Sequence, residues 1–219
     1  MNKPFRSTLI SLGLITSALF AVSSAHAGDA AKGEQLVAAC GACHGADGNS
    51  AMATFPKLAG LGEKYLLKQM QDIKSGARVV PEMAGQVTNL SDAQLGDIAA
   101  YFGSKTIQLS GSEKIQVQLN SGVKVDGLKL GEQVYRAGNL ESGVPACSGC
   151  HSPTGQGNSP AGFPRLGGQH GAYIAKQLRD FRAGNRTNDG EAMIMRGVAQ
   201  HMSDAEIDAV ANYIAGLKP

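Results

Sequence analysis

The chain has 219 residues, a formal net charge of +2, and 5% aromatic residues with no tryptophan. This length exceeds what one very small domain needs and suits two domains of about a hundred residues each. The near-neutral charge gives no support to nucleic-acid binding through a basic surface.

The first 27 residues have the pattern of a secretory signal peptide. Lys3 and Arg6 precede an apolar run at 9–22, and the small residues of Ala25-His26-Ala27 mark a cleavage site. The run is shorter than the ~20 residues that cross a bilayer, which disfavours an uncleaved anchor. We therefore expect an exported chain that starts near Gly28. Losing two basic residues lowers the 20 Lys and Arg to 18, equal to the 18 Asp and Glu.

Three helices are predicted in the N-terminal half, residues 28–105. The first runs over about 30–44 and ends in the sequence CGACH. The second covers 63–75, has an apolar stripe at helical spacing and stops at a glycine. The third opens with a capping box formed by Ser91 and Gln94.

The linker between the halves is expected at 106–129. Apolar and polar residues alternate over 114–119, the segment 120–122 suits a turn, and Val123 and Val125 continue the alternation. The pattern predicts a small hairpin. A flexible connector explains it about as well.

The C-terminal half, residues 130–219, repeats the plan of the first. The matching stretches are FPKLAG at 55–60 with FPRLGG at 163–168, YLLKQ at 65–69 with YIAKQ at 173–177, and SDAQL at 91–95 with SDAEI at 203–207. Their order is kept and only loop lengths vary, which indicates a duplicated domain. The first helix of this copy is expected to begin at Leu130. The predicted fold is all-α, with about three main helices in each of two tandem domains.

All four cysteines lie in two copies of one five-residue pattern. The copies are CGACH, with Cys40, Cys43 and His44, and CSGCH, with Cys147, Cys150 and His151. Residues at i, i+3 and i+4 share one face of a helix, so two thiols and one imidazole point the same way. This is the pattern of c-type haem attachment, in which two thioether bonds fix the porphyrin edge and the imidazole reaches the iron.

Other uses of four cysteines fit this pattern less well. Cysteine pairs that share one zinc ion usually lie about 15 to 20 residues apart, whereas these lie about a hundred apart. A thioredoxin-like thiol pair needs a βαβ setting. A disulfide between cysteines three apart on a helix is strained and leaves the histidine unexplained. Two covalently bound haem c groups are therefore the expected cofactors, and they would fill the centres of two domains poor in large side chains.

Methionine opposite histidine is the ligand that raises the reduction potential in cytochromes c. The repeat selects Met83 and Met195 for this position. Met83 lies seven residues before Leu90, and Met195 lies seven residues before Met202, the counterpart of that leucine. Met193 has no partner methionine in the first half and remains the close rival of Met195.

Several other residues have a functional and an ordinary interpretation. Pro56 and Pro164 recur after each motif, where their carbonyl groups could hold the second nitrogen of the haem histidine; loop prolines explain them nearly as well. His170 and His201 have no counterparts and are expected on the surface. Met70 is expected in the core. The repeated side chains that could contact haem propionates or simply pack are Tyr65, Tyr101, Tyr173, Tyr213, Lys57 and Arg165.

The chain resembles the dihaem cytochrome c4 family. The motifs that carry the resemblance are CHGADGNS at 43–50, GFPRLGGQH at 162–170, FRAGNRTNDG at 181–190 and MIMRG at 193–197, together with the tandem CxxCH motifs. The resemblance implies a class I cytochrome c fold in each half, with His44 and Met83 on one iron and His151 and Met195 on the other. It also implies haem propionates near the interface of the halves. The linker looks longer and more strand-like than in that family.

The resemblance further implies a function without a catalytic residue. Members carry electrons in the periplasm, often loosely associated with the membrane, from donors such as the cytochrome bc1 complex to terminal oxidases. We expect a monomer of this kind, with no nucleic-acid partner. A dihaem enzyme such as a peroxidase, with one haem that opens its distal side, is the alternative. A fixed subunit of an oxidase complex is a third possibility.

Overall fold

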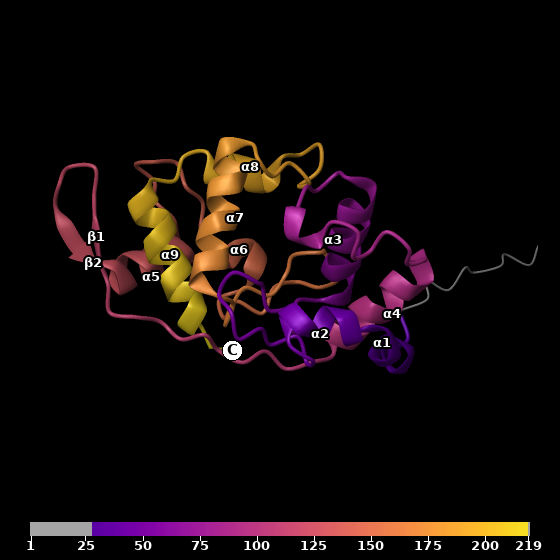
Figure 1. Cartoon of the computed structure of the whole chain (residues 1–219). Helices are drawn as coiled ribbons and strands as arrows, with labels where there is room; N and C mark the ends of the chain where they lie inside the picture. Colours follow the sequence, from indigo (N-terminus) through magenta and orange to yellow (C-terminus); the bar gives the residue numbers. More distant parts are fainter. Residues whose placement is uncertain (1–27, 219) are drawn as a thin grey trace, which may run out of the picture.

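The computed structural model describes residues 28–218, so the predicted signal peptide lies outside the described residues. Figure 1 shows two helical halves side by side. The N-terminal half contains α1 Ala30–Leu36, α2 Ala38–His44, α3 Glu63–Ser75, the 3₁₀ turn η1 Pro81–Met83 and α4 Asp92–Gly103. The C-terminal half contains α5 Gly127–Ala137, α6 Ser148–His151, α7 Gly171–Ala183, α8 Ile194–Ala199 and α9 Asp204–Gly216. The all-α prediction is confirmed.

The predicted second and third helices agree with the structure in both halves. Helices α3 and α7 end at Gly76 and Gly184, whose φ angles of 81° and 75° are in the left-handed region that glycine adopts without steric cost. Helices α4 and α9 begin with complete capping boxes at Ser91 and Ser203. Local sequence signals therefore set these helix ends.

The predicted first helix differs from the structure in both copies. In the N-terminal half the backbone of Val37, with φ −88° and ψ 4°, interrupts it, so α1 and α2 are separate. In the C-terminal half α5 begins at Gly127 and not at Leu130. The reason is Asp126, whose carboxylate accepts hydrogen bonds from the first backbone N–H groups and starts the helix earlier.

Each half has its own hydrophobic core. The N-terminal core includes Leu66, Ile98 and Phe102, and the C-terminal core includes Tyr135, Ile207 and Ile214. In both, the first helix crosses the last one closely, α1 over α4 and α5 over α9. Met202 lies in the C-terminal core, and Met70 packs against the N-terminal core as expected.

Glycine permits these close helix crossings. A Cβ atom added to Gly33 would lie 2.1 Å from the carbonyl oxygen of Asp97, and one added to Gly131 would lie 2.1 Å from that of Ala209. We expect Gly131→Ala to lower the free energy of unfolding by about 1–3 kcal/mol or more, because the helices must move apart. Chemical denaturation of the holoprotein measures this. Gly96→Ala, at a helical position with open space around it, is the matched control and should leave stability unchanged or slightly raised; equal losses in both variants would contradict the packing argument.

The linker is ordered against both halves. Strands β1 Gln116–Gln118 and β2 Lys124–Asp126 form the antiparallel hairpin, and Val117 packs with alanines of α9. Before the hairpin the chain runs past both halves (Figure 1). There Gln108 N–H donates to Asn49 Oδ1 at 2.7 Å, and Ser110 N–H donates to the Gly168 carbonyl at 3.1 Å. The hairpin interpretation is confirmed, and the flexible connector is wrong.

Candidate functional site

A cavity of about 620 Å³ lies in the N-terminal half beside α2. Its wall includes Cys40, Cys43 and His44 from the CGACH motif and Met83 from η1. Apolar side chains line much of the remainder: Leu36, Leu58, Leu66, Ile73, Ile98 and Phe102. The volume is in the range of pockets that hold large organic cofactors. The cavity thus brings together the predicted haem-binding residues of this half and the predicted second ligand.

The two motif histidines are held in the same way. His44 Nδ1–H donates to the Pro56 carbonyl at 2.8 Å, and His151 Nδ1–H donates to the Pro164 carbonyl at 2.9 Å. A carbonyl only accepts, so the proton is on Nδ1 and the Nε2 lone pair is free for a metal. Each imidazole is 7% exposed, and burial lowers the pKa of both, which favours the neutral form that binds metal. The predicted role of the two proline carbonyls is confirmed.

No disulfide joins any two of the four cysteines, all of which lie in the described residues. The first cysteine of each motif, Cys40 or Cys147, is half-buried, and the second, Cys43 or Cys150, is exposed. Burial raises the pKa of the Cys147 thiol, before any group is attached to it, to about 11, which disfavours a thiolate redox centre. Within residues 28–218 no group of three or more His, Cys, Asp and Glu side chains could hold a metal ion. The arrangement suits attachment of an apolar group better than a thiolate centre.

In the C-terminal half, Met195 and Cys147 pack against the hydrophobic core. Met193, the rival ligand, is 51% exposed. Met193 stands immediately before α8, and its φ of 47° is in the left-handed region. Met195 is therefore partly buried against the core, whereas the side chain of Met193 is half in solvent.

Two arginines cross the interface between the halves. Arg78 Nη2 donates to Tyr173 Oη at 3.1 Å and to Gln177 Oε1 at 3.0 Å in the C-terminal half. Arg186 Nη2 donates to Gln69 Oε1 at 2.9 Å in the N-terminal half. All five residues also line the cavity. The cavity therefore has an apolar body and a cationic end to which both halves contribute.

The two arginines donate hydrogen bonds to neutral side chains, and the Asp72 carboxylate lies near Arg78 without a direct ion pair. Arg186 is only 8% exposed, and neither Arg78 nor Arg186 forms an ion pair with Asp or Glu in the described part of the chain. Burial alone would raise the pKa of Tyr65, yet the guanidinium groups of Arg186 and Arg78 lower it. A buried guanidinium group without a direct ion pair, such as that of Arg186, is costly. The two guanidinium groups fit the carboxylates that a haem carries on one edge, which is an observation in favour of that cofactor.

The sequence reasoning missed these arginines, although a signal for them was present. Arg78 and Arg186 are 108 residues apart, the offset that also relates Tyr65 to Tyr173. An arginine repeated at the offset of the duplicated domain is therefore as good an indication of a haem contact as the repeated tyrosine.

The predicted surface position of His170 is wrong. Its Nε2 bonds to the Ser50 carbonyl at 2.9 Å, and its Nδ1 bonds to Ser110 Oγ at 3.0 Å. The side chain thus joins the N-terminal half, the linker and the C-terminal half, and is partly buried between them. His201 is exposed as expected.

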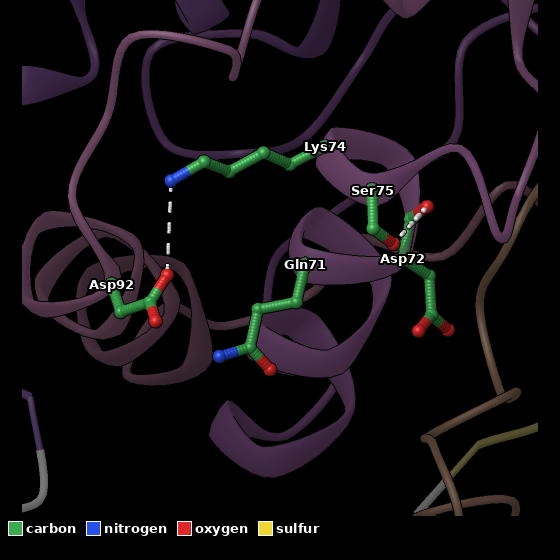
Figure 2. A pocket seen from close by; sticks show the side chains of 5 residues that line it. All are labelled: Gln71, Asp72, Lys74, Ser75 and Asp92. Atoms are coloured by element: carbon green, nitrogen blue, oxygen red, sulfur yellow. Dashed lines mark hydrogen bonds and ion pairs between the residues drawn. The ribbon is translucent and has the colours of Figure 1, made fainter.

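A second hollow, of about 430 Å³, lies at the end of α3 and is lined by Gln71, Asp72, Lys74, Ser75 and Asp92 (Figure 2). Several of its polar groups are already partnered, since Lys74 Nζ lies 3.8 Å from Asp92 Oδ1 and the Ser75 hydroxyl donates to the Asp72 carbonyl. It has no motif residue near it. We assign no function to this hollow.

Comparison with known proteins agrees with this geometry. The sequence profile of the Cytochrome c family matches residues 30–105 and 128–218. Cytochrome c4 of Pseudomonas aeruginosa is 52% identical over 218 residues, which cover 99% of this chain and 100% of that protein. The crystal structure of reduced recombinant cytochrome c4 from Pseudomonas stutzeri has 54% sequence identity and a TM-score of 0.80, and the match covers 87% of this chain and 100% of that one.

A more distant relative has a functional name. The thiosulfate dehydrogenase electron acceptor of Stutzerimonas stutzeri is 37% identical over 180 residues, 82% of this chain and 79% of that protein. The tandem domains, the duplicated motifs and the matches along the whole described chain all agree. The chain belongs to the dihaem cytochrome c4 family, electron-transfer cytochromes, and holds one covalently attached haem c in each of its two cytochrome c domains.

Proposed function

We propose that this chain is a periplasmic electron carrier in which both haems are closed by a histidine and a methionine. The proposed ligands are His44 and Met83 in the N-terminal half and His151 and Met195 in the C-terminal half, with thioether bonds to Cys40, Cys43, Cys147 and Cys150. The observation that carries the proposal is that Met83 lines the same cavity as the complete CGACH motif. When bound, each haem supplies an iron that changes its oxidation state by one electron.

The chain's own residues would then do three things. The Nε2 atoms of the two motif histidines would bind the iron, oriented by the proline carbonyls. The methionine thioethers would supply the second ligand, which would leave no position for a substrate. Arg78 and Arg186 would receive a haem carboxylate at the domain interface, where neither forms an ion pair with Asp or Glu in the described residues. Such a site favours electron transfer over chemistry on a small molecule.

The proposed segments are a signal peptide at 1–27, cytochrome c domains at 28–105 and 130–219, and a linker at 106–129. The signal peptide directs export to the periplasm, the compartment that suits a carrier of this family. Within residues 28–218, none of the helices has the length and apolar character needed to cross a bilayer. A loose association with the membrane, and a monomeric state, complete the proposal.

The proposed partners are a respiratory donor such as the cytochrome bc1 complex and an acceptor such as a terminal oxidase. The name of the 37% identical relative, an electron acceptor of thiosulfate dehydrogenase, supports exchange of electrons with other redox proteins. A peroxidase, the alternative class, needs one haem with an open distal side. Methionines at equivalent positions of both halves argue against that reading.

Stopped-flow spectroscopy of the purified holoprotein tests the proposed function. The oxidised protein should be reduced by bc1-containing membranes supplied with quinol, and a quinol-site inhibitor should block this. The reduced protein should be reoxidised by membranes that contain a terminal oxidase. Turnover of hydrogen peroxide, or rapid carbon monoxide binding to the native reduced protein, would instead favour the enzyme.

A further inference from the structure

Gln169 is a buried polar side chain, 2% exposed, that belongs to the C-terminal half and contacts the backbone of the N-terminal half. Lys57 N–H donates to Gln169 Oε1 at 2.9 Å, and Gln169 Nε2–H donates to the Lys57 carbonyl at 2.8 Å. Gln169 Oε1 also accepts from the His170 backbone N–H at 2.9 Å. The carboxamide therefore fixes one residue of the other half with two hydrogen bonds.

The peptide group that Gln169 contacts is the one that holds His44. The N–H of Lys57 and the C=O of Pro56 belong to the same peptide bond, and that C=O accepts the hydrogen bond from His44 Nδ1–H at 2.8 Å. A continuous chain thus runs from His44 through the Pro56–Lys57 peptide to Gln169. Hydrogen bonds in such chains polarise one another. An acceptor on the N–H makes the carbonyl oxygen a stronger acceptor, which gives the imidazole more anionic character.

In the described residues, the C-terminal half has no equivalent side-chain acceptor on the peptide that holds its histidine. His151 Nδ1–H donates to the Pro164 carbonyl in the same manner. At the offset of 108, however, the counterpart of Gln169 is Leu61, which has no acceptor. In the described part of the chain, no side chain accepts a hydrogen bond from the Arg165 N–H of the Pro164–Arg165 peptide.

We propose that Gln169 is a positioning residue that lowers the reduction potential of the N-terminal haem from across the domain interface. A more basic imidazole stabilises the oxidised iron more than the reduced iron. The effect reaches the haem of one half only, so Gln169 makes two similar domains electronically unequal. The inference rests on the proposed function, because it takes His44 as an iron ligand.

A redox titration of the holoprotein carrying Gln169→Met tests this inference. Methionine has nearly the same size, and its thioether sulfur is a much weaker acceptor for the Lys57 N–H than the carboxamide oxygen. The potential of the N-terminal haem should rise, and that of the C-terminal haem should stay unchanged. Nuclear magnetic resonance of the reduced protein gives an independent reading, since the His44 Nδ1–H signal should move toward that of a weaker hydrogen bond while the His151 signal stays in place. These ring signals also assign each redox step to its domain.

His170→Ala is the matched control. It removes the hydrogen bond to Ser50 across the same interface and leaves the contact between Gln169 and Lys57 intact. It should shift neither potential. An unchanged N-terminal potential in Gln169→Met, equal shifts of both haems, or the same shift in the control would overturn the inference.

The wild-type protein provides a further test that does not depend on the folding of a variant. Its His44 Nδ1–H signal should lie further downfield than the His151 signal, and the reverse order would overturn the inference. A wild-type protein without two reversible redox steps would instead refute the proposed function. If the wild-type protein shows two reversible steps and Gln169→Met leaves the N-terminal potential unchanged, only the proposed role of Gln169 is refuted.

Discussion

Protein made without haem attachment is expected to be largely unfolded. The N-terminal cavity, of about 620 Å³, is much larger than the gap left by truncating one large core side chain, and even such a truncation costs about 2–5 kcal/mol. Small domains have a total stability of about 5–15 kcal/mol. The side chains around the cavity cannot fill it without losing the contacts of α2 and α3 with the core. The haem is therefore expected to be a structural part of the N-terminal domain as well as its redox centre.

Near-ultraviolet circular dichroism of chain expressed without the haem-attachment machinery checks this expectation. The holoprotein prepared in parallel is the reference, and the haem-free chain should lack its fixed aromatic signal. A double Cys147→Ala, Cys150→Ala variant extends the test, because the C-terminal half alone should then lose protection from hydrogen exchange in its core helices. A native-like aromatic spectrum from the haem-free chain would contradict the packing argument.

Met83→Ala is expected to open the N-terminal haem. Loss of the thioether would remove the proposed ligand, which raises the potential, and axial ligands set haem potentials over about 0.8 V, so the fall should be on the order of hundreds of millivolts. Carbon monoxide should then bind this haem in the reduced state. Visible spectroscopy should show that one of the two low-spin methionine signatures is lost.

Met70→Leu is the control for this prediction. Met70 lines the same cavity but packs against the core, so the visible spectrum should not change. In the C-terminal half, Met195→Ala should remove the other signature and Met193→Ala should not. If Met193→Ala removed it and Met195→Ala did not, the ligand of that half would be Met193.

Sequence reasoning succeeded where a signal is local or repeated. The glycine stops and capping boxes fix helix ends through backbone hydrogen bonds within a few residues, so α3, α4, α7 and α9 could be predicted from Gly76, Ser91, Gly184 and Ser203. The second contacts of His44 and His151 were also foreseen, because a proline recurred after each motif. The helix ends depend on residues close in the sequence, and the proline contacts could be predicted because the duplicated domain repeats them.

Features that depend on contacts between distant segments could not be predicted in this way. The break between α1 and α2 falls at Val37, where no glycine or proline in the sequence indicates it. Gln169 and His170 lie between the halves. The N-terminal half has no glutamine or histidine at the equivalent positions, so comparing the two halves does not identify them. Their roles depend on how the C-terminal half docks on Lys57 and Ser50, which is a property of the interface and not of either repeat.

A potentiometric titration of the purified holoprotein, followed through the visible absorption bands, tests the central claim most directly. The claim is that two haems, each closed by histidine and methionine, carry electrons. The titration should show two reversible one-electron steps per chain, both from haems with the methionine signature. A single step, or a haem that lacks this signature in the native protein, would contradict it.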